Sequence, residues 1–331
     1  QQTDNQDGAG TTGQPNVNPA GMDTASPTDY QQQDGDAKPD NTNGTATSSQ
    51  TTGQQSENTG TASSTTTTTT ADTTKVKHEI KNIAFFGMSV SEVGGIDTDR
   101  SDMIIIVSVD IDRNRVALTS VLRDSKVPIE GHSPQKINAA YKYGGAPLAI
   151  KTLNQNFHLD IADYVTVNFE NLIEIVDYMG GVDIELTAAE ASQVPGTVDG
   201  MNHLDGKKTL AYVSIRKIDS DFYRASRQQT VLMELLKKIK DKAKTEYPEI
   251  IRKFMNCMET SLTYGEILDI VTSLDVPNIK VDQITVPDKN FETNLKGGLD
   301  ETGSWVYTFD IEEVADRIHR NIYGSGIKKN K

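Results

Sequence analysis

Residues 102–124 read DMIIIVSVDIDRNRVALTSVLRD, and they give the clearest indication of the fold class. Residues 102–110 are a continuous apolar run with many β-branched side chains, which is typical of a strand buried on both faces. The polar residues 111–115 follow as a turn, and residues 115–124 resume as a strand, so the two strands are predicted to form a hairpin. Residues 82–87 (NIAFFG) predict another buried strand of the same kind.

Helices and strands interleave along the rest of the chain without a repeat. Strand patterns occur at 163–169, 182–186 and 279–288. One helix is predicted to begin near Pro147, and further helix patterns occur at 170–179, 221–240, 261–274 and 310–324. Residues 207–217 fit a short helix or a strand equally well. This alternation predicts one α/β domain, a three-layer α/β/α arrangement with a mixed sheet between helices.

Composition divides the chain unevenly. Residues 1–76 consist mainly of Thr, Gln, Ser, Gly, Asn and Asp, and such a segment buries too little apolar surface to offset the entropy lost on ordering. We therefore expect a disordered linker over 1–76, a folded domain over 77–325 and a basic tail over 326–331.

Charge and residue usage exclude several classes of function. The net charge of −14 argues against nucleic-acid binding, because binding to a phosphate backbone needs a positive field. The only cysteine, Cys257, allows no internal disulfide and is expected in the core. The five histidines are scattered without metal-ligand spacing, and there is no Gly-rich phosphate loop or nucleophile elbow.

The polar linker suggests an exported protein that is held away from a membrane. No apolar run of the chain is long enough to span a bilayer. Because the chain begins with Gln, we expect an N-terminal membrane segment that this sequence lacks.

Residues 216–229 (RKIDSDFYRASRQQ) concentrate basic side chains just before an amphipathic run. Ser220 and Asp221 are N-cap candidates, so Arg224 and Arg227 fall in the first turns of a helix. Cations are unfavourable there, because the free N–H groups already carry partial positive charge. An anion held between the arginines and the helix end, either a phosphate or a carboxylate, would remove this conflict.

Three polar clusters stand at the ends of apolar runs, where α/β folds place their sites. They are Arg100 with Asp102, Arg123 with Asp124, and Arg216 with Arg224, Arg227 and Gln228. Each cluster alone is explained as well by a salt bridge or a solvated loop. Together they favour a pyrophosphate, which guanidinium groups bind in bidentate fashion, with Asp102 holding Mg²⁺ against it.

The chain resembles the LytR-CpsA-Psr family. The motifs that carry the resemblance lie in family order between residues 82 and 236, and they read RSDMIIIVSVD, SVLRDS, KINAAYKYGG, DYVTVNFENLIEIVDYMGGVDIEL, LDGKKTLAYVSIRK and DFYRASRQQ. The resemblance implies an extracytoplasmic domain on one N-terminal transmembrane helix. It also implies Mg²⁺-dependent transfer of a wall polymer, either teichoic acid or a capsular or secondary wall polysaccharide, from a polyprenyl-pyrophosphate carrier to peptidoglycan.

The family motifs imply a role for each matching residue of this chain. Asp102 is implied as a catalytic, metal-associated carboxylate, with Arg100 and Arg123 as catalytic arginines. The implied pyrophosphate-binding residues are Lys136, Asn138, Arg216, Arg224, Arg227 and Gln228. Leu122 stands where the family usually has proline.

Two positions depart from the family pattern. Ser89 stands where an Asp is usual, and Ser214 where an Arg is usual. A hydroxyl is a weaker Mg²⁺ ligand than a carboxylate, so Glu92, Asp97 or Asp99 would have to replace the missing acid. These departures leave a second hypothesis open, a non-catalytic relative that binds polyprenyl phosphates in wall assembly or its regulation.

Two further alternatives stay open from the residues. The apolar helix faces of 170–179 and 230–240 fit either an ordinary core or a pocket for the lipid carrier. A regulator or adhesion module that works through the Thr/Gln-rich linker is a third functional hypothesis, but it leaves the arginines unexplained.

Overall fold

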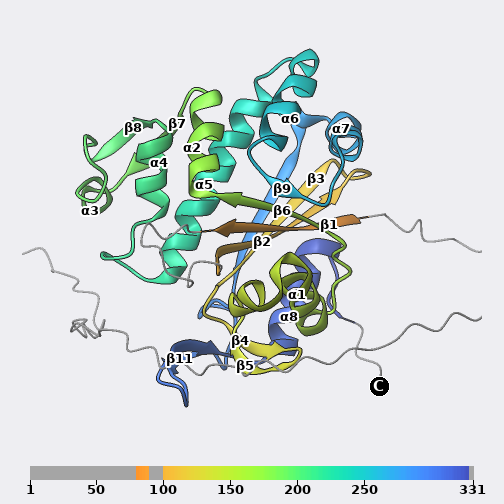
Figure 1. Ribbon diagram of the computed structural model, residues 1–331, viewed down its shortest axis with the longest axis vertical. Coiled ribbons are helices and arrows are strands. Elements are labelled where there is room, and N and C mark those ends of the chain that lie inside the picture. The colour runs from red at the N-terminus through yellow and green to blue at the C-terminus, as the bar shows by residue number, and fades with distance from the viewer. Residues whose placement is uncertain (1–79, 89–99, 328–331) are drawn as a thin grey trace, which may run out of the picture. The chain divides into compact units, whose positions relative to one another are not determined.

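The computed structural model of the protein describes residues 80–88 and 100–327 (Figure 1). The predicted linker over 1–76 lies outside these residues, as do Ser89 and the acidic candidates Glu92, Asp97 and Asp99. None of the helices in the described part combines the length and the apolar character needed to cross a membrane.

A six-stranded mixed sheet forms the centre of the domain. Its strand order is β10-β3-β2-β1-β6-β9. The strands are β1 (Ile80–Met88), β2 (Ser101–Asp110), β3 (Arg115–Val121), β6 (Asp163–Asn168), β9 (Glu259–Thr260) and β10 (Lys280–Val286). Strand β2 is antiparallel to both β1 and β3, which confirms the predicted hairpin, while β6 runs parallel to β1 and β10 parallel to β3.

Helices cover both faces of this sheet, so the predicted three-layer α/β/α arrangement is confirmed (Figure 1). One face carries α1 (Ala139–Phe157) and α8 (Ile311–Tyr323). The other carries α2 (Phe169–Tyr178), α4 (Gly206–Val213), α5 (Asp221–Lys240), α6 (Tyr247–Met255) and α7 (Tyr264–Ser273). The alternation of β1 explains the two cores, since Ala84 and Phe86 pack toward α1 and α8 while Phe85 packs toward the opposite side.

Three small hairpins stand outside the central sheet. They are β4 (Lys126–Ile129) with β5 (His132–Lys136), β7 (Val182–Leu186) with β8 (Gly200–Leu204), and β11 (Lys296–Leu299) with β12 (Trp305–Thr308). Among the described residues, the remaining elements are the short helix α3 (Ala188–Ala191) and the 3-10 turns η1 (Lys244–Glu246) and η2 (Val276–Asn278). The strand predicted at 182–186 therefore exists, but it pairs only with β8.

Two helices settle or correct the sequence interpretation. The ambiguous residues 207–217 begin as helix α4, whose N-cap Asp205 accepts a hydrogen bond from the Lys208 N–H. The helix predicted to begin near Pro147 begins at Ala139 instead. Gly144 and Gly145 interrupt it with non-helical backbone, so Pro147 opens only its second segment. Cys257 is buried, as expected.

Candidate active site

Strand direction brings Asp102 and Arg123 together. Because β1, β3, β6 and β10 all run one way and β2 runs the other, the beginning of β2 lies at the edge where the other four end. Asp102 is the second residue of β2, and Arg123 follows the last residue of β3 by two positions. Both side chains therefore reach the same edge of the sheet, which is where α/β folds place ligands.

Asp102 is held by two arginines. Arg123 Nη1 lies 2.5 Å from Asp102 Oδ1, and Arg216 Nη2 lies 2.7 Å from Oδ2. Burial alone would raise the pKa of Asp102, but the charges of Arg123, Arg216 and Arg224 outweigh it and lower the pKa from its ordinary value of 3.8. Asp102 therefore stays ionised at neutral pH and fixes the two guanidinium groups.

The lowered pKa of Asp102 makes a prediction about acid stability. A carboxyl whose folded pKa lies below its unfolded pKa contributes stability above the unfolded value and loses it as the pH falls through the folded value. We expect Asp102→Asn to lower the free energy of unfolding at neutral pH and to make its decline below about pH 4 shallower. Urea denaturation across a pH series measures both, and parallel curves for variant and wild type would contradict the assignment.

Asp221 joins Arg123 to Arg224. Its Oδ1 lies 3.3 Å from Arg123 Nε and also forms an ion pair with Arg224 Nη2. Asp221 is the acidic residue in the first turn of α5, so it offsets the cations at that helix end. The anion expected between the arginines and the helix is thus supplied by the protein's own carboxylate.

The two acids of this cluster differ in their proton affinity. Burial, opposed by Arg224 and Arg123, raises the pKa of Asp221 above its ordinary value. The pKa of Asp102 is lowered. Pairs of carboxyls whose environments push their pKa values apart are typical of sites that need one permanent anion and one group able to accept a proton.

Arg227 has a different environment from the one expected for a pyrophosphate ligand. It is 3% exposed, and its guanidinium donates to both carboxylate oxygens of Asp219 at 2.6 and 2.8 Å and to the Ile215 carbonyl at 2.9 Å. Glu190 lies 3.4 Å from Nη1. Arg227 lines none of the pockets described below, and it connects α5 to the segment that carries Arg216.

Lys136 and Asn138 lie beside the segment that carries Arg123. Lys136 Nζ is 2.9 Å from Asp124 Oδ1, and the Asn138 N–H donates to the Arg123 carbonyl at 3.3 Å. Asn138 is buried, and its Oδ1 has no hydrogen-bond partner among the described residues. These two contacts hold in place the segment that carries Arg123.

The remaining predicted residues are spread around the cluster. Gln228 lies one residue beyond Arg227, and it lines the apolar pocket described below. Arg100 precedes β2, and its Nε is buried without a hydrogen-bond partner in the described residues. Ser214 is the C-cap of α4 and lines none of these pockets.

A polar pocket of about 330 Å³ opens beside the cluster. Its walls combine the arginines and acids with two aromatic residues: Arg123, Asp124, Ile215, Arg216, Asp219, Ser220, Asp221, Arg224, Trp305 and Tyr307. Neither Trp305 nor Tyr307 belongs to the residues that the sequence motifs indicate. The available signal was the chain's single tryptophan, which follows a Gly- and Asp-rich turn.

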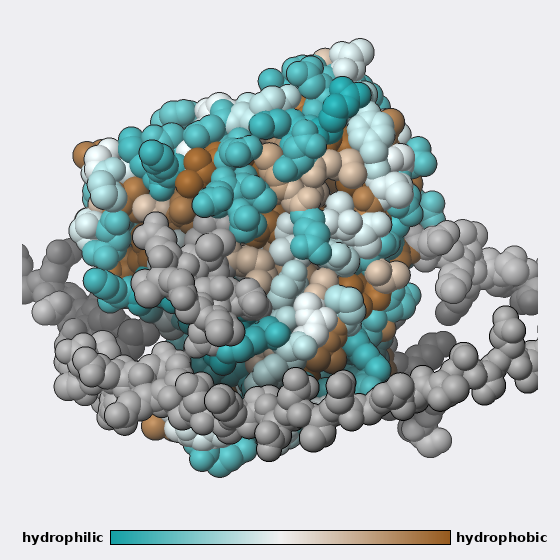
Figure 2. Space-filling view, viewed as in Figure 1, coloured by the Kyte–Doolittle hydropathy of each residue, from teal (hydrophilic) through white to brown (hydrophobic). Residues whose placement is uncertain are grey.

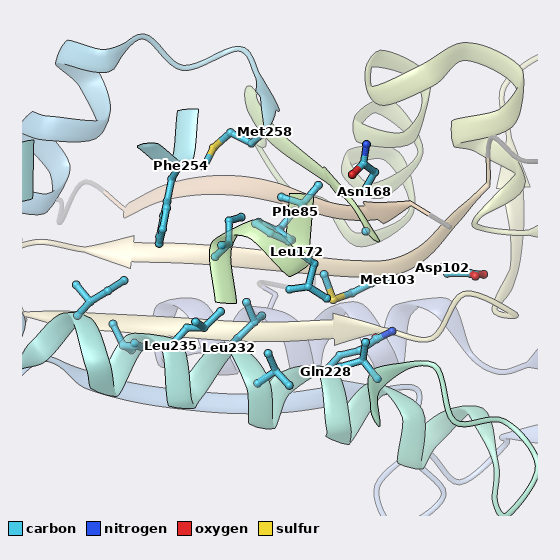
Figure 3. Close-up of a pocket in the computed structure, with 17 residues that line it drawn as sticks. Phe85, Asp102, Met103, Asn168, Leu172, Gln228, Leu232, Leu235, Phe254 and Met258 are labelled. Carbon is cyan, nitrogen blue, oxygen red and sulfur yellow. The ribbon is translucent and has the colours of Figure 1, made fainter. Parts of the chain in front are cut away.

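An apolar pocket of about 220 Å³ adjoins the same cluster (Figure 3). It lies between the sheet and helices α2, α5 and α6, and its labelled walls include Phe85, Met103, Leu172, Leu232, Leu235 and Phe254. The predicted faces of α2 and α5 therefore do line a pocket.

Hydrophilic residues cover most of the face shown in Figure 2, with hydrophobic ones visible between them.

The two pockets meet at the charged cluster. Asp102, Met103 and Gln228 line the apolar pocket and also a narrow gap beside Arg123. Arg123, Asp221 and Arg224 line that gap and the polar pocket. The edge of the sheet thus offers an apolar cavity, then a cluster of acids and arginines, then a polar pocket with aromatic residues.

A sequence model of the LytR_cpsA_psr family matches residues 43–320. A protein named polyisoprenyl-teichoic acid–peptidoglycan teichoic acid transferase TagU, from Oceanobacillus iheyensis, is 28% identical over 252 residues, 73% of this chain and 75% of that protein. The protein of the same name from Enterococcus faecalis is 28% identical over 193 residues, which cover 57% of this chain but only 64% of the relative.

Solved structures share the fold. The crystal structure of TagV from Bacillus subtilis superposes with a TM-score of 0.62 and 24% identity, over 74% of this chain and 98% of that one. TagT bound to LIIa-WTA superposes with a TM-score of 0.60 and 22% identity, over 73% of this chain and 91% of that one.

Proposed function

The chain belongs to the LytR_cpsA_psr family, and we propose that it is a phosphotransferase that moves a wall glycopolymer from a polyprenyl-pyrophosphate carrier to peptidoglycan. The relatives named TagU are teichoic acid transferases by name, and the solved TagT structure holds LIIa-WTA.

The order of the three surfaces along the sheet edge carries this proposal. An apolar cavity fits the polyprenyl tail, and the arginine cluster next to it fits the two phosphates. Arg123, Arg216 and Arg224 line the polar pocket together with three carboxylates, those of Asp124, Asp219 and Asp221. The carboxylates hold the guanidinium groups in place, and the N–H groups that remain can donate to phosphate oxygens.

The reaction exchanges one phosphate–oxygen bond for another. The oxygen of a wall-sugar hydroxyl bonds to the phosphorus that bears the glycan, and the bond from that phosphorus to the bridging oxygen breaks. Polyprenyl phosphate leaves. Arg123 and Arg224 neutralise charge on the phosphates and on the leaving group, which is the main task of a protein in phosphoryl transfer.

Asp221 is the carboxyl that we assign to accept the hydroxyl proton. It lies between Arg123 and Arg224, and its raised pKa brings it nearer to the pH at which a general base works best. Asp102, whose pKa is lowered, stays charged and holds Arg123 and Arg216 in place.

Magnesium dependence stays a prediction. Within residues 80–88 and 100–327 no group of three or more His, Cys, Asp or Glu side chains could hold a metal ion. Both oxygens of Asp102 are already paired with arginines. These residues do not by themselves fit a Mg²⁺ site, so no step above involves a metal.

Location at the outer face of the membrane is a further part of the proposal. The relatives' names place their acceptor in peptidoglycan, and a protein that takes a polyprenyl carrier as its donor must work beside the bilayer that holds it. An N-terminal anchor preceding the polar linker would keep the domain there. Fractionation of cells that express the full-length gene product tests this, and recovery from the cytoplasm would contradict it.

A transfer assay tests the proposed activity. The purified protein is incubated with a polyprenyl-diphosphate-linked glycan, Mg²⁺ and a peptidoglycan fragment. We expect release of polyprenyl phosphate and a glycan–peptidoglycan phosphodiester, both detected by mass spectrometry. Binding of the donor without release would favour the non-catalytic alternative instead. In that case the double variant Ser89→Asp, Ser214→Arg should gain activity.

A further inference from the structure

The hairpin β11–β12 has one face toward the core and one toward the polar pocket. Its register pairs Gly297 with Tyr307 and Leu299 with Trp305, so these four residues share a face. Val306, on the other face, is 2% exposed and packs inward. Trp305 and Tyr307 therefore point together toward the pocket that both of them line.

The indole of Trp305 rests on a glycine. A Cβ added at Gly297 would lie 2.8 Å from Trp305 Cζ2 and within 3.5 Å of two more atoms of the six-membered ring. The absence of a side chain at 297 thus makes room for the ring. Trp305 is 49% exposed, so the indole keeps an open surface although it is supported from beneath.

The hairpin is tied firmly to the charged cluster. The Tyr307 N–H donates to the Asp124 carbonyl at 2.8 Å, next to Arg123. Lys126 Nζ lies 2.6 Å from Glu301 in the hairpin turn, and Asp300 accepts hydrogen bonds from the N–H groups of Thr302 and Ser304. In Figure 1, β11 lies beside β4 and β5. The aromatic pair is a fixed part of the pocket wall.

The same pocket contains the arginines of the cluster. Arg123, Arg216 and Arg224 line it together with Trp305 and Tyr307. Arg123 and Arg224 also line the gap that leads to the apolar cavity. From the cavity outward, a bound molecule would meet apolar side chains, then guanidinium groups, then an aromatic surface.

We infer that Trp305 and Tyr307 form a saccharide subsite that binds the first sugar ring of the donor, next to its diphosphate. This inference rests on the proposed function. In a polyprenyl-diphosphate glycan the apolar tail, the two phosphates and the first sugar follow one another in the same order as the three surfaces.

The chemistry of the pair suits a sugar ring. One side of a pyranose presents C–H groups, whose partial positive charge is attracted to the negative face of an indole. The pKa of Tyr307 is raised, chiefly by burial and further by Asp221 and Asp124, so its hydroxyl keeps the proton that it can donate to a sugar oxygen. Apolar stacking and one polar group together fix an orientation.

Two ligands separate the sugar contact from the rest of the site. One is polyprenyl diphosphate, and the other is polyprenyl diphosphate that carries a single N-acetylhexosamine. We expect Trp305→Ala to weaken binding of the sugar-bearing ligand about tenfold and to leave binding of the bare diphosphate unchanged. Trp305→Phe, which keeps an aromatic ring, should recover most of the difference. Titration calorimetry measures the affinity of wild type and of each variant for both ligands.

Two more variants guard against a misfolded hairpin. Thr308→Ala removes an exposed side chain from the opposite face of the same hairpin, away from the pocket, and this variant should bind both ligands as wild type does. Gly297→Val displaces the indole without removing it, because the new side chain would clash with the ring that lies against Gly297. This variant should weaken binding of the sugar-bearing ligand only.

Each other result overturns the inference. If Trp305→Ala weakens binding of both ligands equally, the indole supports the arginines and does not bind a sugar. Unchanged binding of both, with a higher KM for the peptidoglycan fragment, would assign the aromatic pair to the acceptor. A wild-type protein that binds neither ligand would contradict the proposed function itself.

Discussion

Arg123→Ala is expected to lower the rate of polymer transfer by about 10²–10³-fold, the usual effect of removing one charge-stabilising donor. Arg123 pairs with both Asp102 and Asp221 and lines the passage between the two pockets. Its loss removes a positive charge from the diphosphate site and leaves two mostly buried carboxylates facing each other. The rate at saturating donor, measured by release of polyprenyl phosphate, reports the effect.

The same substitution has a structural cost that must be measured separately. Arg113→Ala is a matched control, because Arg113 Nη1 pairs with Asp110 Oδ2 at 3.0 Å in the turn at the opposite end of the β2–β3 hairpin. This variant should keep its transfer rate. Arg123→Lys retains the charge but not the planar fork, and we expect an intermediate rate. A near-normal rate in Arg123→Ala would remove Arg123 from the mechanism.

Leu232→Glu is expected to weaken binding of the polyprenyl donor by about 10²-fold or more, because a carboxylate placed among apolar groups must lose its hydration when the tail enters. Leu232 lies on α5 and lines the apolar pocket (Figure 3). The experiment compares the affinities of polyprenyl diphosphate and of a diphosphate ester with a short, water-soluble chain. Only the first affinity should fall.

Met233→Glu is the control for this substitution. Met233 is the next residue of the same helix, is partly exposed and does not line the pocket, so the variant adds the same charge without reaching the tail. It should bind both ligands as wild type does. If Leu232→Glu also binds the polyprenyl ligand normally, the cavity is an ordinary gap in the core and the tail lies elsewhere.

Much of the secondary structure of this protein could be predicted from patterns of neighbouring residues. The apolar runs at 82–87 and 102–110 predict strands covered on both faces, since buried strands need apolar residues on each side. The polar turn between 110 and 115 predicts the hairpin, and the amphipathic pattern at 170–179 predicts α2. These features depend on backbone geometry over a few consecutive residues, which a sequence pattern records directly.

The partners of charged side chains depended on the tertiary structure. Arg224 and Arg227 are three residues apart on one helix, yet Arg224 reaches Asp221 and the polar pocket while Arg227 is enclosed by Asp219 and Glu190. Likewise, the strand at 182–186 looks as suited to the central sheet as any other, but it pairs with β8 alone.

Local residue patterns thus predict the class of the fold, the order of its central elements along the chain and the presence of arginines at the start of a helix. Contacts between distant segments bring particular arginines to Asp102 and Asp221, form the apolar cavity and place Trp305 beside the charged cluster. The physical reason is that a local pattern reflects the period of the backbone, whereas a site forms where strand ends from distant segments meet at one edge of a sheet.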